Sequence, residues 1–598
     1  MGSSSAQVKK GQAYLFGSYR LNSDGILYRQ NREIHLAPKE LEALRFLILN
    51  AGRVVTAFEL KQHLWDQVNV TSESLPRCIS SLRAALEPDE VIQTVYKRGY
   101  RFVAPVQYQH QGPVAPPQRI VVLPFATGED VPAYLGPAIA EEMIMRLSSA
   151  SVAGRKVVSV LARDSVFALA QQGQTAQQVG KAMAADLALT GSLRALPEHF
   201  RLRVVAIRVE DSAEIWVDDF LVERSPIARF ETEMIRRILA RIDVDALSLA
   251  AAIKPLPACS NEVSRLEAYE AFRRGHYRTS EPLRREMHEG LLDLLRATEL
   301  DPTLITAQID LINALITRTY CGLMSPAMAA EQARRAARAL PAQFAGSANV
   351  LPPIGWIRFH LDHNLEGALR AFQQSADLPY DPWVSRARVT FALSRHRFDE
   401  AIALIEDALR IDPFAPWQHG RLIWAWHLAG NLDKSLLQAE HALKLFPGHE
   451  GVTFYASIVT AFAGQTERAL QMTEALTRRF PHFDLALALH GYALACAGRE
   501  QEAAEIVERL QWLSRERYVS SSFLSAICVK LGNLDCAIEE LRAAEEARCP
   551  WFFQMLADPR LQALHGMPEF QRMLGALTTM ESSISKGALS ATQEHALK

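Results

Sequence analysis

Cysteine is scarce in this sequence, and no arrangement of cysteines marks a site. The 598 residues include seven cysteines, and none of them forms a CxxC pair. Zinc-ribbon and thioredoxin-like sites therefore have no support, and a reducing cytosol is the compartment that fits best. The chain also lacks any run of about 18 uncharged apolar residues, so no segment is expected to cross a membrane as a helix. The first residues lack the apolar stretch of a secretory signal.

A large excess of charge of one sign is missing too. The chain has 65 Lys and Arg residues against 67 Asp and Glu residues, which gives a formal net charge of −2. It is therefore not a polycation as a whole, and any surface for nucleic acid must be local. Hydrophobic residues make up 49% and charged residues 22%, which is typical of folded globular proteins and excludes wholesale disorder.

Motifs of catalysis and metal binding are also lacking. None of the patterns GxxxxGK[ST], GxSxG, HExxH and GxGxxG occurs. His360 and His363 lie one helical turn apart, but no third metal ligand is identifiable, and both are expected at the surface. Glu141 and Glu142 diverge around a helix, so they are expected as surface carboxylates rather than as a catalytic pair. The sequence therefore predicts no enzyme, no cofactor and no metal site.

Two proline-rich segments divide the chain. They lie within residues 108–119 and 254–260 and are expected to be linkers, because proline stiffens an extended chain and removes backbone donors. The predicted fold is multidomain: a winged helix (α+β), then a small α/β domain, then an all-α tetratricopeptide superhelix. The predicted parts are residues 11–107, the linker 108–118, residues 119–246, the linker 247–262, residues 263–576 and a flexible tail at 577–598.

The third part carries an internal repeat. Glycines recur every 34 residues, and His396 holds the preceding slot; the glycines are Gly430, Gly464, Gly498 and Gly532. Five residues further on stands a small residue in each unit, namely Ala401, Ser435, Ala469, Ala503 and Ala537. Prolines follow at 413, 447 and 481. A 34-residue period is that of the tetratricopeptide repeat, in which glycine ends the first helix, small residues let two helices approach, and proline stops the second helix.

The middle part reads as a small α/β domain with mixed strand order. Residues 119–126, RIVVLPFA, form an apolar run that predicts a buried strand, and a helical pattern follows at 134–148. Residues 200–210 and 214–223 alternate in polarity, as half-buried antiparallel strands do, and a last helix is expected at 227–242. The IVVLPF and AADLALTGSLR segments resemble the TolB-like module of bacterial regulators.

Residues 11–107 follow the plan of three strands, three helices and a basic hairpin. On the third helix, SLPRCISSLRAAL, apolar residues at 75, 79, 82 and 86 are expected to face the core. The same spacing leaves Arg77, Ser80, Ser81 and Arg83 to solvent, which suits a helix that enters the major groove of DNA. Lys97 and Arg98 in the hairpin are expected to contact phosphates or the minor groove. Residues 1–107 carry 14 basic and 10 acidic residues, an excess in the right direction.

This region resembles the OmpR/PhoB-type winged helix, through APKELEALRFLILNAGRVVT, SLPRCISSLRAAL and TVYKRGYRF. With the other two parts, the order is similar to that of HilA-type regulators of type III secretion and invasion genes. The resemblance implies DNA contacts by Arg77, Cys78, Ser80, Ser81 and Arg83 on the helix and by Thr94 and Tyr96 on the wing. The family's paired arginines are serines here, at 80 and 81, and Tyr96 replaces its wing arginine, so the target sequence does not transfer. The resemblance places the polymerase contact between the second and third helices, at Asp66, Gln67, Val68, Asn69, Val70 and Thr71.

The expected function is that of a cytoplasmic one-component regulator, an activator of virulence or secretion genes. Its expected partners are double-stranded promoter DNA, RNA polymerase, a protein or peptide on the repeat domain and a second copy of the chain, with no membrane. The alternative is a tetratricopeptide scaffold whose winged helix docks protein rather than DNA. Salt-dependent DNA binding separates the two hypotheses.

Overall fold

The computed structural model describes residues 12–22, 25–29, 32–65, 73–87, 89–95, 98–110, 118–149, 151–152, 155–156, 158–197, 199–223, 262–280, 283, 286–339, 350–375 and 381–579. These residues fall into two compact units. The N-terminal unit holds the described residues up to Gln118 and those within 146–159. The larger unit holds the other described residues, which belong to the middle and repeat parts of the chain.

A five-stranded antiparallel sheet opens the N-terminal unit, in the order β4-β3-β2-β1-β8. The expected first strand is two strands, because the chain turns at Gly17, whose φ is +53°. Residues 108–110, expected as the start of a linker, instead lie in β8, where Tyr108 pairs with Tyr14. The strands are β1 (Gln12–Phe16), β2 (Tyr19–Leu21), β3 (Leu27–Arg29), β4 (Arg32–Ile34) and β8 (Val106–His110).

Three helices and a hairpin complete the winged helix. Its remaining elements are α1 (Pro38–Leu49), β5 (Val54–Val55), α2 (Ala57–Leu64), α3 (Ser74–Ala85), β6 (Ile92–Val95) and β7 (Gly99–Phe102). Pro38 begins α1 and Thr56 caps α2 through a bond from the Glu59 N–H, as the sequence predicts. Phe16, Leu47, Ile79 and Phe102 lie in one buried cluster made only of residues from this region, so the winged helix has its own core.

A mixed sheet forms the middle domain, in the order β13-β9-β14-β15-β16, with β10 paired to β14. β9 runs parallel to β14, whereas β14, β15 and β16 are antiparallel, which confirms the expected mixed order. The helix expected at 227–242 lies outside the described residues. The elements are β9 (Gln118–Val122), β10 (Ala126–Thr127), α4 (Leu135–Ser149), β11 (Ser151–Val152), β12 (Arg155–Lys156), β13 (Val158–Val160), α5 (Arg163–Gln171), α6 (Ala176–Ala182), β14 (Leu187–Ala195), β15 (His199–Arg208) and β16 (Glu214–Glu223).

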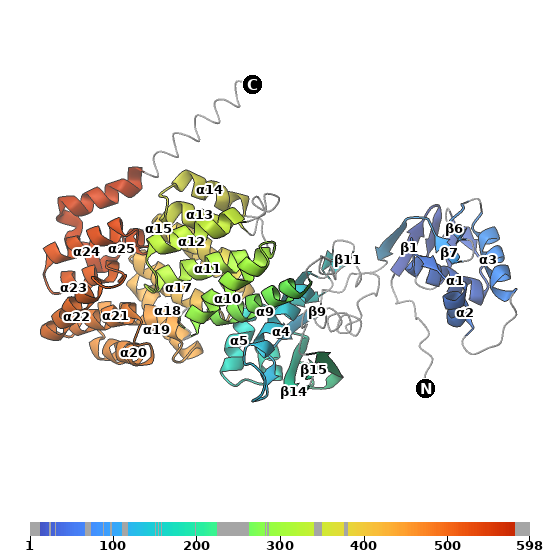
Figure 1. The fold of residues 1–598 in the computed structure, drawn as a ribbon, viewed down its shortest axis with the longest axis horizontal. Coiled ribbons are helices and arrows are strands. Elements are labelled where there is room, and N and C mark those ends of the chain that lie inside the picture. Colours follow the sequence, from blue (N-terminus) through green and yellow to red (C-terminus); the bar gives the residue numbers. More distant parts are fainter. Residues whose placement is uncertain are drawn as a thin grey trace, which may run out of the picture. The chain divides into compact units, whose positions relative to one another are not determined.

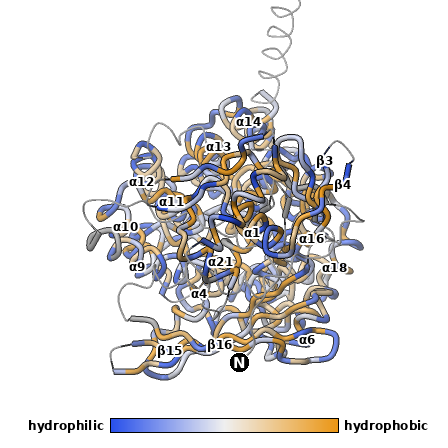
Figure 2. Tube along the Cα trace, turned by 90° about the vertical axis from the view of Figure 1, so that its right-hand side faces the viewer, coloured by the Kyte–Doolittle hydropathy of each residue, from blue (hydrophilic) through white to orange (hydrophobic). Residues whose placement is uncertain are grey.

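Antiparallel helix pairs follow one another through the repeat domain (Figure 1). Hydrophobic and hydrophilic stretches alternate along these helices (Figure 2). None of the described helices combines the length and apolarity needed to cross a membrane. The helices are α9 (Glu262–Thr279), α10 (Met287–Leu300), α11 (Ile305–Tyr320), α12 (Pro326–Ala339), α13 (Leu351–His360), α14 (Leu365–Gln374), α15 (Pro382–Ser394), α16 (Phe398–Ile411), α17 (Pro416–Leu428), α18 (Leu432–Leu445), α19 (Glu450–Phe462), α20 (Thr466–Arg479), α21 (Asp484–Cys496), α22 (Glu500–Leu513), α23 (Ser522–Lys530) and α24 (Leu534–Glu546).

The 34-residue frame is confirmed by the backbone and by burial. The four repeat glycines have φ between +74° and +79°, and His396 in the preceding slot has φ +56°. The small residues five positions on are all 0% exposed, and they lie where paired helices meet. α16, α18 and α20 each end two residues before a repeat proline. Each expected role in the repeat is therefore filled by the predicted residue.

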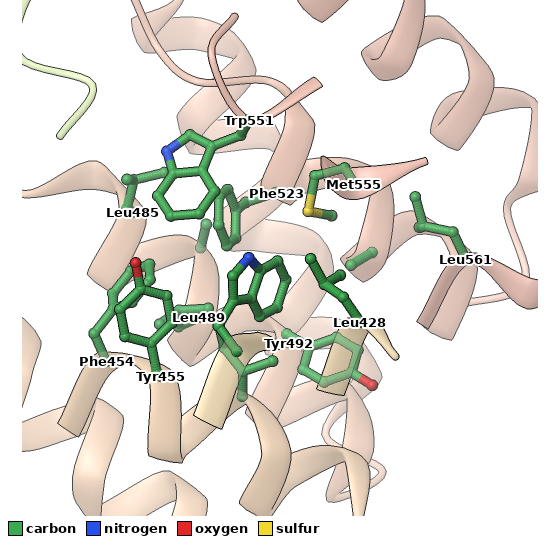
Figure 3. Packing of buried hydrophobic residues seen from close by; sticks show 14 of the residues in the cluster. Leu428, Phe454, Tyr455, Leu485, Leu489, Tyr492, Phe523, Trp551, Met555 and Leu561 are labelled. Atoms are coloured by element: carbon green, nitrogen blue, oxygen red, sulfur yellow. The ribbon is translucent and has the colours of Figure 1, made fainter. Parts of the chain in front are cut away.

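The closing segment packs against helices far upstream in the sequence. It consists of α25 (Phe552–Met555), the 3-10 helix η1 (Pro559–Gly566) and a helix at 568–579. The Trp551 indole N–H donates to the Tyr320 carbonyl at 2.8 Å, and the Trp424 indole N–H donates to Gln554 Oε1 at 2.8 Å. Trp551 lies beside Leu485, Phe523, Phe454 and Tyr455 in the buried cluster (Figure 3). The segment thus lies across several repeats instead of extending the stack.

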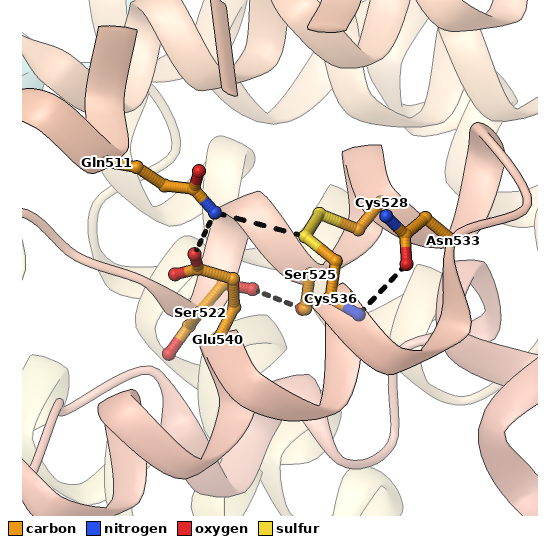
Figure 4. The surroundings of a disulfide bond; sticks show 7 residues. All are labelled: Gln511, Ser522, Ser525, Cys528, Asn533, Cys536 and Glu540. Atoms are coloured by element: carbon orange, nitrogen blue, oxygen red, sulfur yellow. Dashed lines mark hydrogen bonds between the residues drawn. A yellow bond between two sulfur atoms is a disulfide. The ribbon is translucent and has the colours of Figure 1, made fainter. Parts of the chain in front are cut away.

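One disulfide lies within a repeat. Cys528 of α23 and Cys536 of α24 are joined, with their Cα atoms 5.9 Å apart (Figure 4). The two cysteines stand eight residues apart and form no CxxC motif, so the sequence pattern does not predict this link; they come together because α24 turns back along α23. The Cys536 N–H also donates to the cap side chain of Asn533 at 3.0 Å, so the same turn is held by a hydrogen bond.

A buried polar junction joins the middle domain to the repeats. Glu141 accepts hydrogen bonds from Arg163 at 2.6 and 2.9 Å and lies 3.1 Å from His276 Nε2 of α9, while Glu142 pairs with Arg273 at 3.3 Å. The expectation that both glutamates lie at the surface is therefore wrong: they are 9% and 2% exposed. Burial alone would raise the pKa of Glu141, but the cations around it hold that pKa well below its usual range.

Candidate nucleic-acid interface

α3 presents one apolar face and one polar face, as its sequence period predicts. Leu75, Ile79 and Leu82 are at most 1% exposed and pack into the winged-helix core. On the other side Arg77 is exposed over 82% of its side chain, and Ser80 is exposed as well. The apolar face of α3 is therefore held by the winged-helix core, and its polar face is exposed to solvent.

Arg77 is held only weakly in place. Its guanidinium lies 3.2 Å from the carboxylate of Glu73, one turn earlier on the chain, and both side chains are largely exposed. Exposed ion pairs of this kind contribute about 0–1 kcal/mol to stability, so the Arg77 guanidinium can leave Glu73 for a more strongly binding partner at little cost. A guanidinium with this freedom can bind a phosphate or the acceptor edge of guanine.

Arg83 makes contacts that the sequence pattern did not predict. Its Nε and Nη2 donate to the Ile92 carbonyl at 3.1 and 2.9 Å, and Nη2 also donates to Thr94 Oγ1 at 2.7 Å. The side chain therefore bridges α3 to the first strand of the wing. Two of the predicted contact residues, Arg83 and Thr94, are brought together by this bridge, which fixes the wing strand relative to the helix.

Ser81 and Cys78 are engaged with α1. Ser81 Oγ donates to Glu40 Oε1 at 2.5 Å, and Glu40 also accepts from the Ala37 N–H at 2.8 Å. Cys78 Sγ lies 3.6 Å from the Lys39 carbonyl, and burial, followed by the nearby Glu40 carboxylate, raises the pKa of the thiol. A raised pKa disfavours the thiolate, so this cysteine is poorly suited to redox chemistry. Both residues hold α3 against the start of α1.

The wing turn is fixed by a close backbone contact. β6 and β7 pair from Ile92 with Phe102 to Val95 with Gly99. Gly99 has φ +141°, and a Cβ there would lie 2.0 Å from the Val55 carbonyl oxygen, so only glycine fits. Arg98 is exposed at this turn. Tyr96, Lys97 and the predicted polymerase-contact residues 66–71 lie outside the described residues.

Sequence reasoning missed one exposed aromatic residue in this unit. Phe58, near the start of α2, is 75% exposed. Its position follows from the helical period: Leu60 and Leu64 of the same helix face the core at 0% and 1% exposure, and Phe58 lies off that face.

The histidine pair does not form a metal site. His360 is 2% exposed rather than at the surface as expected, and its ring centroid lies 4.5 Å from that of Trp356. Burial lowers the pKa of His360 to about 3, so the ring is neutral at physiological pH. Across the part of the chain that the structure describes, no three His, Cys, Asp or Glu side chains are grouped to hold a metal ion.

Comparison with known proteins matches this unit to a family of DNA-binding domains. Residues 31–102 match the family model described as "Transcriptional regulatory protein, C terminal". The transcriptional regulator HilA of Salmonella typhi is 35% identical over 127 residues, which is 20% of this chain and 22% of HilA. The transcriptional activator CadC of Escherichia coli is 32% identical over 83 residues, which is 13% of this chain and 16% of CadC. The matches thus cover about a fifth or less of these relatives' lengths.

Solved structures resemble the chain only loosely. A tetratricopeptide repeat protein from Parabacteroides merdae is 13% identical, with a TM-score of 0.29, over 45% of this chain and 98% of its own. MamA from Desulfovibrio magneticus is 20% identical, with a TM-score of 0.21, over 27% of this chain and 93% of its own. The tetratricopeptide assignment therefore stands on the 34-residue frame and its helix pairs.

Proposed function

We propose that this protein is a cytoplasmic one-component transcriptional regulator that binds double-stranded promoter DNA and catalyses no reaction. One observation carries the proposal: α3 exposes Arg77 and Ser80 on a face held rigidly by a complete winged-helix core. The match of residues 31–102 to a transcriptional-regulator domain supports it independently. In this proposal α3 enters the major groove, while Thr94, Tyr96, Lys97 and Arg98 of the wing contact the backbone or the minor groove.

The proposal extends to activation of virulence or secretion genes. It is supported by the 35% identity to HilA and by the 32% identity to CadC, which is named an activator. Residues 66–71 connect α2 to α3 in the sequence, so a polymerase bound beside the promoter could reach them. We expect substitutions there to reduce activation in a reporter assay while promoter affinity stays nearly unchanged.

The larger unit is proposed to receive the signal. Repeat domains present extended surfaces, and a protein or peptide partner or a second copy of the chain would bind there. Because the middle domain is tied to the repeats by buried ion pairs, a partner on either one acts on both.

Fluorescence anisotropy with the full chain tests the proposal. The probe is a promoter duplex found by genome-wide occupancy, with a scrambled duplex as comparison. Affinity should fall steeply between about 50 and 200 mM salt, because phosphate contacts release counterions. Arg77→Ala should weaken binding, whereas Arg32→Ala, which removes an exposed arginine from edge strand β4, should not. If the folded chain binds neither the promoter duplex nor the scrambled duplex at low salt, the scaffold alternative is favoured.

A further inference from the structure

A cavity walled by aromatic residues lies inside the repeat domain. It is lined by 23 residues, of which nine are aromatic and five are tryptophan. Its walls come from the first helix of successive pairs, including Tyr320 of α11, Trp356 of α13, Trp383 of α15 and Trp424 of α17. Such walls suit the flat apolar part of a ligand.

The charge inside this cavity is positive. Among the described residues that line it, Arg386, Arg421 and Glu450 are the charged ones, and the Glu450 carboxylate lies 3.7 Å from Arg479 Nη2. Arg386 forms no ion pair with any described residue; its guanidinium stacks 3.9 Å from the Trp383 ring centroid. Burial, and then the nearby Arg421, lower the pKa of Arg386 to about 9, so it stays charged at neutral pH beside a like charge. An anion would relieve this repulsion.

A second donor lines the same cavity. The Trp417 indole N–H is buried without a hydrogen-bond partner, and Gly451 packs so closely on the ring that a Cβ there would lie 2.6 Å from it. Buried donors without partners are rare in folded proteins, and each calls for an explanation. In contrast, the indole N–H groups of Trp424 and Trp551 are satisfied by Gln554 and by the Tyr320 carbonyl.

The closing segment limits the size of the ligand. Trp551 forms part of the cavity wall, and its indole N–H ties it to α11 by donating to the Tyr320 carbonyl. The cavity volume is about 90 Å³. A single water needs about 10–15 Å³ of such volume, so the cavity has room for a small molecule but not for a peptide chain.

We propose that this cavity binds a small organic anion with an aromatic body, its carboxylate or phosphate held by Arg386 and Arg421 and its ring by the tryptophans. The Trp417 N–H supplies a further hydrogen bond to the anion. The site lies on the repeat domain, away from the winged helix in the sequence, and does not depend on DNA binding.

Titration of tryptophan emission on the full chain tests this site, because five of the nine tryptophans line the cavity. The probes are 3-phenylpropionate, phenyl phosphate and the neutral 3-phenylpropionamide. One or both anions should saturate the signal, and the amide should bind about tenfold more weakly or worse, because a hydrogen-bonded charge is lost. The anion that binds more tightly identifies the carboxylate or the phosphate as the natural group.

Variants place the binding at the proposed residues. Arg386→Gln should weaken anion binding at least about tenfold and leave amide binding unchanged, whereas Arg515→Gln, at an exposed position outside the cavity, should change neither. Should Arg386→Gln fail to fold, Trp417→Phe keeps the ring and loses only the N–H, and a several-fold loss is expected. The proposal is overturned if no anion saturates the signal below about 10 mM, if acid and amide bind equally, or if only a peptide with a free C-terminus binds.

Discussion

Arg77 and Arg83 lie six residues apart on α3 but make different contacts, which allows reading of DNA to be separated from positioning. Arg77→Ala removes a side chain that, among the described residues, pairs only with the exposed Glu73. Promoter affinity should fall by about 1–3 kcal/mol if the arginine reads a base, with no measurable loss of folding stability. Anisotropy titration and chemical denaturation of the same variant check both statements, and a stability loss comparable with the affinity loss would contradict the assignment.

Arg83→Ala should instead destabilise the winged helix. The change leaves the Ile92 carbonyl and Thr94 hydroxyl without their charged donor, which should cost about 1–2 kcal/mol of unfolding free energy. Promoter binding should also weaken, because the wing strand is no longer tied to α3. Arg83→Lys keeps the charge but not the forked donor geometry, so it should restore little of the stability. If Arg83→Ala weakens binding without destabilising the fold, this arginine contacts DNA directly.

The sequence showed which α3 residues face outward, but not what they touch. Burial of Leu75, Ile79 and Leu82 follows from local helical spacing. The bond from Ser81 to Glu40 spans 41 residues, and only the packing of α3 on α1 brings the two side chains together. Contacts of this kind depend on tertiary geometry, for which one sequence carries no periodic signal.

At the scale of elements, the repeat helices were the most predictable, because their signal is local and recurs. His396 shows this well: it takes the left-handed conformation of the glycines because its place in the frame requires it. The ends of strands were harder to predict from the sequence. β8 extends to His110 because it pairs with β1, which lies more than ninety residues earlier in the sequence. The junction glutamates were misplaced because their partners lie on elements distant in sequence.

Ala503→Trp should disrupt the repeat stack. Ala503 of α22 is 0% exposed at the close approach of paired helices, and a large side chain there overpacks the contact at a cost of about 1–3 kcal/mol. Neighbouring repeats share interfaces, so several should loosen together. Thermal melting followed by circular dichroism measures the loss. Glu508→Trp, on the exposed side of the same helix, is the control, and equal melting of the two variants would mean that the repeat frame is wrong.

At the scale of the whole molecule, most of the middle domain, with residues 119–145 and 160–223, forms one compact unit with the repeats. Proline spacing predicted a linker between them but carried no information about whether the flanking domains pack together. Ser165 of α5 shows the packing directly: its N–H donates to Asp412 Oδ1 at 3.0 Å, its hydroxyl donates to the same oxygen, and its Oγ accepts from the Phe414 N–H at 2.6 Å.

This junction should make stability depend on pH. Burial, and then the nearby Asp164, raise the pKa of Asp412 to about 7, against about 4 in an unfolded chain. The folded state therefore holds a proton that the unfolded state releases, so the stabilisation is complete below pH 4 and is lost as pH rises through 7. Asp412→Asn keeps the acceptor for Ser165 without the charge, and should be more stable than the parent at pH 8 by about 1–3 kcal/mol.

Denaturant titration at pH 5 and pH 8 measures this difference. The two proteins should differ less at pH 5 than at pH 8, because the folded parent carboxyl is still protonated at pH 5 and ionisation of the unfolded chain has removed only part of the stabilisation. His276, whose pKa is raised to about 10 by Asp310 and Glu141 against the effect of burial, keeps its own contribution in both proteins. Asp407→Asn, at an exposed position on α16, the helix that ends just before Asp412, serves as the control. If the difference in unfolding free energy between Asp412→Asn and the parent is the same at pH 5 and at pH 8, Asp412 is ionised in the folded protein.

The division into two units predicts how a truncated chain behaves. The winged helix has its own buried core, and every member of that core lies between Tyr14 and Phe102. Deletion from residue 263 onward should therefore spare promoter binding, and a fragment of residues 1–118, which keeps β8, should bind the same duplex. The deletion should at the same time expose Glu141, Glu142 and Ser165, so the remaining middle domain should unfold more readily than in the full chain.

Gel-shift titration paired with a reporter assay on both truncations tests the division of roles: promoter binding should persist while regulated expression changes. A folded 1–118 fragment that fails to shift the duplex would mean that operator recognition needs the larger unit, most simply because that unit pairs two copies of the chain on one promoter.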